Sequence, residues 1–129
     1  MFEPPSKGSM ETCNSLDGVA ALHIQTRTEA ATSWRTQVVL NRGQYRFEGK
    51  ARVSGVRPLP FGVHQGAGLR AGGSTRQSEN LVGDTSWRPL QAEFRIETDN
   101  TVADLICELR ASAGEAWFDL NSLKLIRVQ

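Results

Sequence analysis

The sequence predicts an all-β protein, an antiparallel β-sandwich of jelly-roll type with about eight strands. Short segments rich in apolar residues alternate with Gly, Asn, Asp and Ser, at the regular spacing expected of a sandwich or barrel. The longer segments alternate apolar and polar residues with a period of two, because successive strand side chains point to opposite faces. No segment carries the apolar stripe of an amphipathic helix.

Length and composition indicate one globular domain. The chain has 129 residues, of which 39% are hydrophobic and 22% charged. A domain of this size buries about two thirds of its unfolded surface, so it needs no metal or disulfide to fold. Its 15 Lys and Arg against 14 Asp and Glu leave a net charge of +1. We therefore expect neither nucleic acid nor an anionic membrane as a partner. No apolar run approaches the roughly 18 residues of a membrane span, and no signal peptide is visible.

The elements follow in order along the chain. Residues 1–16 carry two prolines and many small polar residues without a period, and we interpret them as an N-terminal arm or linker. Residues 17–129 are expected to form the sandwich domain. Turns are predicted at 41–43, 83–86, 98–100 and 112–114, where Gly, Asn, Asp and Ser gather. Strands are predicted at 19–27, 34–40, 44–55, 61–73, 87–97, 102–111 and 115–128, with a loop and a short strand at 74–82.

Residues 44–55 form the clearest predicted strand. Its apolar residues fall on one face and its charged residues on the other, so the apolar face must be buried. The same alternation recurs in residues 87–97 and 102–111. We therefore predict one core between two sheets that contains Tyr45, Phe47, Val53, Phe94, Ile96, Leu105 and Leu109.

Four motifs in order carry a family resemblance. They are GQYRF at 43–47, the glycine-rich GAGLRAGG at 66–73, TSW at 85–87 before a strand ending in FRI at 94–96, and GEAWFDL at 114–120. Over residues 17–129 their order and spacing resemble the carbohydrate-binding modules of families four, nine and twenty-two, in the galactose-binding-like β-sandwich group. The resemblance departs at the opening strand, to which only Phe2-Glu3 corresponds. This departure indicates the terminal domain of a longer protein.

The resemblance implies a non-catalytic module that binds a polysaccharide or glycan. We expect it to serve as an accessory domain of a larger secreted, surface or periplasmic protein. The resemblance places Glu108 where xylan-binding relatives carry a ligand-contacting Glu. It also places Asp119 at the family's structural calcium position, with Glu3 or Glu11 as a second carboxylate. The alternative for Asp119 is a turn cap or an ion pair with an Arg.

A sugar site combines aromatic rings with planar polar side chains that pair with hydroxyls. Trp34, near a strand start, is the expected exposed stacking platform, and Trp87 is the second candidate. We predict that the polar faces of residues 44–52, 61–73 and 102–111 share one concave sheet, with a groove opened by Gly66 and Gly68. The alternative is a solvated strand face with cross-strand ion pairs. The predicted ligand-binding residues are Trp34, Arg46, Arg52, His64, Arg70, Trp87, Glu108 and Arg110.

No catalytic residues are predicted. Glu93 and Glu108 would form a glycosidase-type pair if they faced each other across neighbouring strands, but nothing nearby would raise a carboxyl pKa. Cys13 and Cys107 allow one disulfide, although Cys107, among apolar residues, is more typical of a buried free thiol. The second function class is a structural or protein-interaction β-sandwich without a sugar site. Such a domain would expose a flat apolar patch instead of an aromatic ring.

Overall fold

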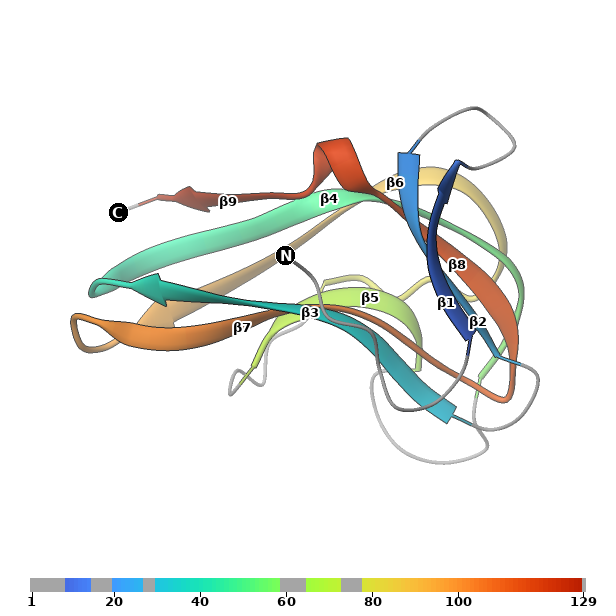
Figure 1. Cartoon of the computed structure of the whole chain (residues 1–129), viewed down its shortest axis with the longest axis horizontal. Coiled ribbons are helices and arrows are strands. Elements are labelled where there is room, and N and C mark those ends of the chain that lie inside the picture. The colour runs from blue at the N-terminus through green and yellow to red at the C-terminus, as the bar shows by residue number, and fades with distance from the viewer. Residues whose placement is uncertain (1–8, 15–19, 27–29, 59–64, 73–77, 129) are drawn as a thin grey trace.

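Nine strands and one short 3-10 helix make up the computed structural model, which describes residues 9–14, 20–26, 30–58, 65–72 and 78–128 (Figure 1). The strands form two antiparallel sheets, which confirms the predicted β-sandwich. The elements are β1 (Ser9–Asn14), β2 (Ala20–Thr26), β3 (Ala30–Leu40), β4 (Gly43–Arg57), β5 (Gly66–Ala71), β6 (Gly83–Ile96), β7 (Thr101–Ala111), β8 (Ala113–Asp119), η1 (Leu120–Ser122) and β9 (Lys124–Arg127).

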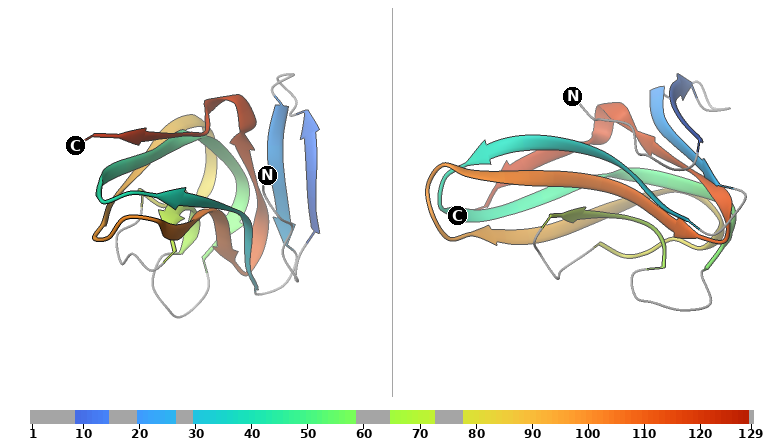
Figure 2. Two further views of the ribbon diagram at one scale, coloured as in Figure 1. Left: turned by 60° about the vertical axis from the view of Figure 1, so that its left-hand side comes forward. Right: turned by 60° about the horizontal axis from the view of Figure 1, so that its bottom comes forward.

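The two sheets differ in size. The larger has six strands in the order β1–β2–β8–β4–β6, with β9 also paired to β4, and the smaller has three in the order β3–β7–β5. Figure 2 shows that the sheets form two layers and that β1 and β2 stand at one end, beyond β8. No helix within the described ranges is long and apolar enough to cross a membrane.

Three segments depart from the sequence prediction. Part of the expected arm forms β1, which pairs with β2 from Ser9 opposite Gln25 to Asn14 opposite Ala20. The predicted turn at 83–86 is instead the start of β6. Pairing between β4 and β6 continues through two register shifts as far as Val56 opposite Gly83. The predicted closing strand is broken by η1 into β8 and β9. The first two departures are set by backbone pairing to another segment, which side-chain alternation does not report. The third is a local turn that the Asp119 side chain caps.

The long strand β4 organises the larger sheet. β6 pairs along one of its edges, while the other edge pairs with β9 at residues 45–48 and with β8 at residues 51–57. η1 lies between these two partners, where the Lys50 backbone N–H donates to Ser122 Oγ at 2.8 Å. Gly49 leaves room for Leu123 there, since a Cβ at this position would lie 2.5 Å from Leu123 Cδ2 and the leucine side chain would have to move. Figure 1 shows η1 rising above β4 on the outer side of the sheet.

The core lies between the two sheets. Phe47, Phe118, Leu69 and Leu109 are among its largest fully buried side chains. All seven residues predicted to share one core belong to the single buried apolar cluster, which confirms that prediction. The alternating faces of β4, β6 and β7 therefore pack inward, and their opposite faces form the outer surfaces of the sandwich.

Candidate functional site

The predicted binding groove does not exist as one surface. β4 belongs to the six-stranded sheet, whereas β5 and β7 belong to the three-stranded sheet. Arg46 and Arg52 therefore lie on the opposite side of the sandwich from Arg70, Glu108 and Arg110. Alternation correctly assigned these side chains to outer faces, but it carries no information about which strands are neighbours. His64, another predicted ligand contact, lies outside the described residues.

On the three-stranded sheet, Glu108 is the centre of an ion-pair cluster. Its carboxylate accepts from Arg70 Nε at 2.9 Å and lies 3.9 Å from Arg110 Nε. The residue is only 3% exposed, so its outward direction does not make it accessible. Gly68 is its cross-strand partner, and Gly66 allows a close approach of the Leu81 backbone. A ligand reaching Glu108 would have to displace Arg70 and leave a buried charge without its partner.

Trp34 is not an exposed stacking platform. It is 7% exposed and belongs to the core cluster, and its indole Nε1 donates to the His23 backbone oxygen at 3.2 Å. The strand pattern held a signal for this position, because Trp34 alternates in phase with Val38 and Leu40, which also pack against the core. The prediction was wrong because a position near a strand start does not expose a side chain that shares the inward phase of its strand.

The outer face of the six-stranded sheet carries a row of three rings and one guanidinium across four strands, which we call the aromatic row. It consists of His23 on β2, Trp117 on β8, Arg52 on β4 and Trp87 on β6. The His23 and Trp117 rings stack with centroids 5.1 Å apart and planes 19° apart. The Arg52 guanidinium lies 5.4 Å from the Trp117 ring centroid and 5.9 Å from that of Trp87. Cross-strand register explains the row, since Trp117 is the pairing partner of both His23 and Arg52.

The aromatic row is held from both sides. His23 Nε2 lies 2.9 Å from Glu115 Oε2, which fixes the imidazole against the Trp117 ring. Arg52 lies within cation–π distance of both indoles, so its guanidinium links the Trp117 and Trp87 side chains across β4. Trp87 and Trp117 are both partly exposed. His23 is 8% exposed, and it lies against Trp117 from β2 while Arg52 lies against it from β4. The site therefore presents to solvent the remaining exposed parts of two indoles and the Arg52 side chain, groups of the kind that pack against pyranose rings and pair with hydroxyls.

The sequence prediction included Arg52 and Trp87 but missed Trp117 and His23. A signal for Trp117 was present, because it stands between Ala116 and Phe118, both 0% exposed, and must point outward. His23 similarly alternates with the buried Leu22 and Ile24. What alternation could not show is that these outward residues align across β2, β8 and β4.

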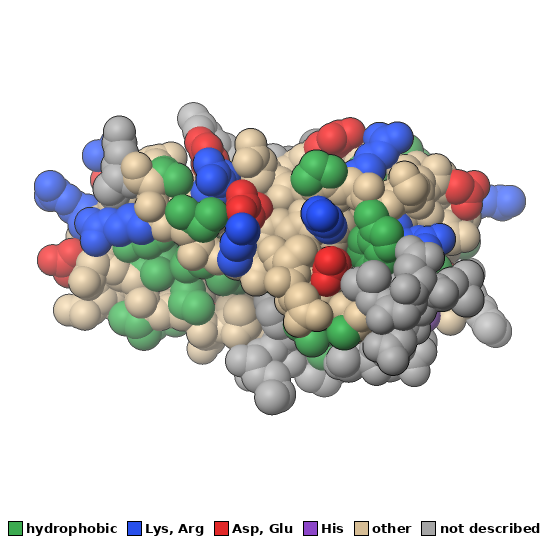
Figure 3. Space-filling model, turned by 90° about the horizontal axis from the view of Figure 1, so that it is seen from above, with side chains coloured by type: hydrophobic (Ala, Val, Ile, Leu, Met, Phe, Trp, Pro, Cys, Tyr) green, Lys and Arg blue, Asp and Glu red, His purple; other side chains and the backbone are tan. Residues whose placement is uncertain are grey.

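Farther along β4, charged side chains pair with one another. Glu48 accepts from Arg46 Nε at 3.0 Å and lies 3.3 Å from Lys124 Nζ. Figure 3, which looks onto this face from above, shows acidic and basic side chains close together rather than in patches of one sign. Arg46 is thus part of a local ion-pair network on the same face as the aromatic row.

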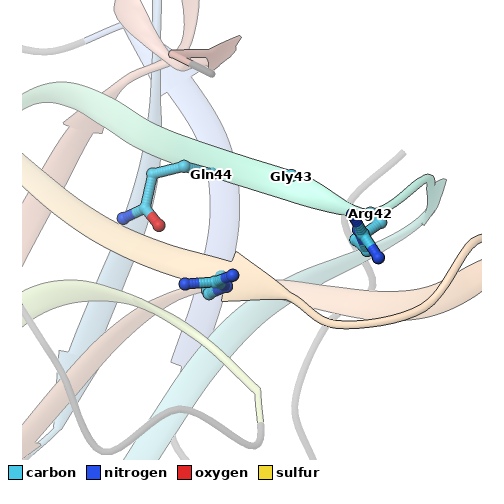
Figure 4. A pocket seen from close by; sticks show the side chains of 4 residues that line it. Arg42, Gly43 and Gln44 are labelled. Carbon is cyan, nitrogen blue, oxygen red and sulfur yellow. The ribbon is translucent and has the colours of Figure 1, made fainter.

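Among the described residues, two hollows lie along the six-stranded sheet. A small one of about 110 Å³ is lined by Arg42, Gly43, Gln44 and Arg95 at the start of β4 (Figure 4). A larger one of about 390 Å³ lies between η1, β4 and β6, and we call it the η1 pocket. Only the second falls within the range of about 300–1,000 Å³ that is typical of small-ligand sites.

Asp119 has a structural role in the described residues. As the N-cap of η1, its Oδ1 accepts from the Asn121 backbone N–H at 3.1 Å. The part of the chain that the structure describes contains no group of three or more His, Cys, Asp or Glu side chains that fits a metal. Glu3 and the side chain of Glu11 lie outside that part. Asp119 is therefore the one predicted calcium ligand that the described side chains supply, and calcium binding stays a prediction.

The arrangement excludes the paired-carboxylate chemistry considered above. Glu93 is exposed on β6 of the larger sheet, and Glu108 is buried on β7 of the smaller sheet. The two carboxylates therefore do not face each other across neighbouring strands. Cys107 is a buried free thiol, as predicted.

Comparisons with known proteins establish the fold. No family model and no curated protein matches the chain. A solved structure of TmCBM61 in complex with beta-1,4-galactotriose matches with a TM-score of 0.60 and 14% identity, over 98% of this chain and 87% of that one. The CBM22-1 xylan-binding domain from Paenibacillus barcinonensis Xyn10C matches at 0.60 and 16%, over 99% and 86%. A CBM4 structure matches at 0.58 and 15%, over 95% and 80%. The chain has the β-sandwich fold of carbohydrate-binding modules, which confirms the resemblance at the level of the fold.

Proposed function

We propose that the domain is a non-catalytic carbohydrate-binding module that holds a polysaccharide or glycan against the outer face of its six-stranded sheet. The observation that carries this proposal is the aromatic row, where Trp117 and Trp87 flank the Arg52 guanidinium. Indole faces bind the apolar faces of pyranoses, and the guanidinium donates to ring hydroxyls. The structural neighbours support it, since the CBM22-1 structure is named as a xylan-binding domain and that of TmCBM61 holds a galactotriose.

The second function class, an interaction domain without a sugar site, has less support. Among the described residues the exposed large apolar side chains are Val39, Val82, Val102 and Val128. Val39 and Val102 are cross-strand partners, but two valines fall well short of the several hundred Å² expected of a contiguous docking patch. We also propose that the module belongs to a larger secreted or surface protein, where it would keep a partner domain near its substrate.

The test is a glycan array followed by titration calorimetry on the best ligand. We expect Trp117→Ala and Trp87→Ala each to weaken binding at least tenfold, because aromatic anchors at binding sites contribute about 2 kcal/mol or more. The matched control is Val102→Ala, an exposed site on the other sheet, which should bind like the wild type. Melting curves check that each variant is folded. If the wild type binds no glycan, or both Trp variants bind as well as the control, the proposal is wrong.

A further inference from the structure

The η1 pocket adjoins the aromatic row. Lys50, which lines the pocket, precedes Arg52 by two residues on the same face of β4. At about 3.3 Å per residue, their Cα atoms are roughly 7 Å apart, a distance that one to two sugar units span. A glycan that stacks on one of the two indoles and runs along β4 reaches the pocket within one or two units. Its lining residues are Glu48, Gly49, Lys50, Pro89, Leu90, Gln91, Asn121, Ser122 and Lys124.

Among the charged side chains that line the η1 pocket, one lysine forms no ion pair with a described carboxylate. The Glu48 carboxylate is shared by Lys124, at 3.3 Å, and Arg46, at 3.0 Å. Lys50 is exposed, and within the described part of the chain no ion pair joins its ammonium group to a carboxylate. Its backbone is fixed by the hydrogen bond to Ser122, so the side chain starts from a defined point at the pocket wall. Two lysines and one glutamate give the lining a net positive charge.

Neutral sugars offer this ammonium group hydroxyl acceptors but no opposite charge. The amide groups of Gln91 and Asn121 already offer donors and acceptors for hydroxyls in the η1 pocket. An ammonium group supplies three donors and a full charge, and its matching ligand group is an anion. We therefore propose that the glycan carries an acidic sugar, a uronic acid, whose carboxylate binds Lys50 one or two units from the ring stacked on the aromatic row. This inference rests on the proposed function.

The experiment compares ligands that differ only in charge. Oligosaccharides of glucuronoxylan, galacturonan and alginate are titrated as free acids and as methyl esters, together with neutral xylan and galactan oligosaccharides. Among the uronate ligands that bind, we expect the free acid to bind about two- to fivefold more tightly than its ester, the range for one exposed ion pair. This difference should shrink as salt is raised. Lys50→Gln should remove this preference for the free acid over its ester.

The matched control is Arg95→Gln, which removes the same charge from the same sheet face. Arg95 pairs with Gln44, six residues along β4 from Lys50, so it lies roughly 20 Å away. This variant should keep the preference for the acid. Equal affinity of acid and ester, or equal loss in both variants, would overturn the inference. If neutral glycans still bind through Trp87 and Trp117, the proposed function stands without the acidic sugar. Absence of all glycan binding would overturn both.

Discussion

Substitution of Trp34 tests whether this side chain belongs to the core or to the binding surface. The side chain is 7% exposed, so Trp34→Ala removes a large core residue, at a cost of about 3–5 kcal/mol. An unfolding entropy of about 2.1 cal/mol/K per residue gives about 0.27 kcal/mol/K for 129 residues. The melting temperature should therefore fall by roughly 11–18 °C. Trp34→Phe keeps a ring but loses the indole hydrogen bond to His23, so it should cost at least about 1 kcal/mol.

Trp117→Ala is the matched control for Trp34→Ala. It removes the same side chain from the outer face, so it should lower the melting temperature much less and should weaken glycan binding. Trp34→Ala, measured well below its own melting temperature, should bind glycan like the wild type. Scanning calorimetry and titration calorimetry provide the two readouts. If Trp34→Ala melts within about 3 °C of the wild type and loses binding, then Trp34 acts as an exposed platform and the assignment of the two faces fails.

Three further measurements test other parts of the structure. If Asp119 ligates calcium, excess chelator should lower the melting temperature by several degrees, whereas an unchanged melting curve would leave it as the cap of η1 alone. Gly114→Ala should destabilise the domain more than Gly55→Ala. Gly114 has φ 133° and its Cβ would lie 2.6 Å from the Val56 Cα, while Gly55, at φ 62°, has open space. Equal urea midpoints would contradict this. Burial, and secondarily the Glu108 charge, raises the pKa of the Cys107 thiol above its usual 9.0. The unfolded chain therefore ionises first, and stability should fall by up to about 1.4 kcal/mol per pH unit above pH 9. Cys107→Ala should remove that slope in urea unfolding at pH 8 and pH 10.

The sequence determined the two faces of each long strand. Period-two alternation assigned Tyr45, Phe47 and Phe94 to the core, and the structure buries all three. The same alternation sent Arg52 outward, where it lies between two indoles. These assignments succeed because the direction of a strand side chain is local, set by its own backbone, and because an apolar face must leave water in any arrangement of the sheets.

Only the tertiary structure decided which outward residues meet. The predicted groove joined β4 to β5 and β7, whereas β4 pairs with β6, β8 and β9. Strand pairing is made by backbone hydrogen bonds between segments far apart in the chain, and those bonds carry no side-chain signature that a single sequence reveals. Trp117 meets Arg52 across a separation of 65 positions because β8 pairs with β4. The aromatic row is therefore a product of sheet order, while each of its members, taken alone, was already outward-facing in the sequence.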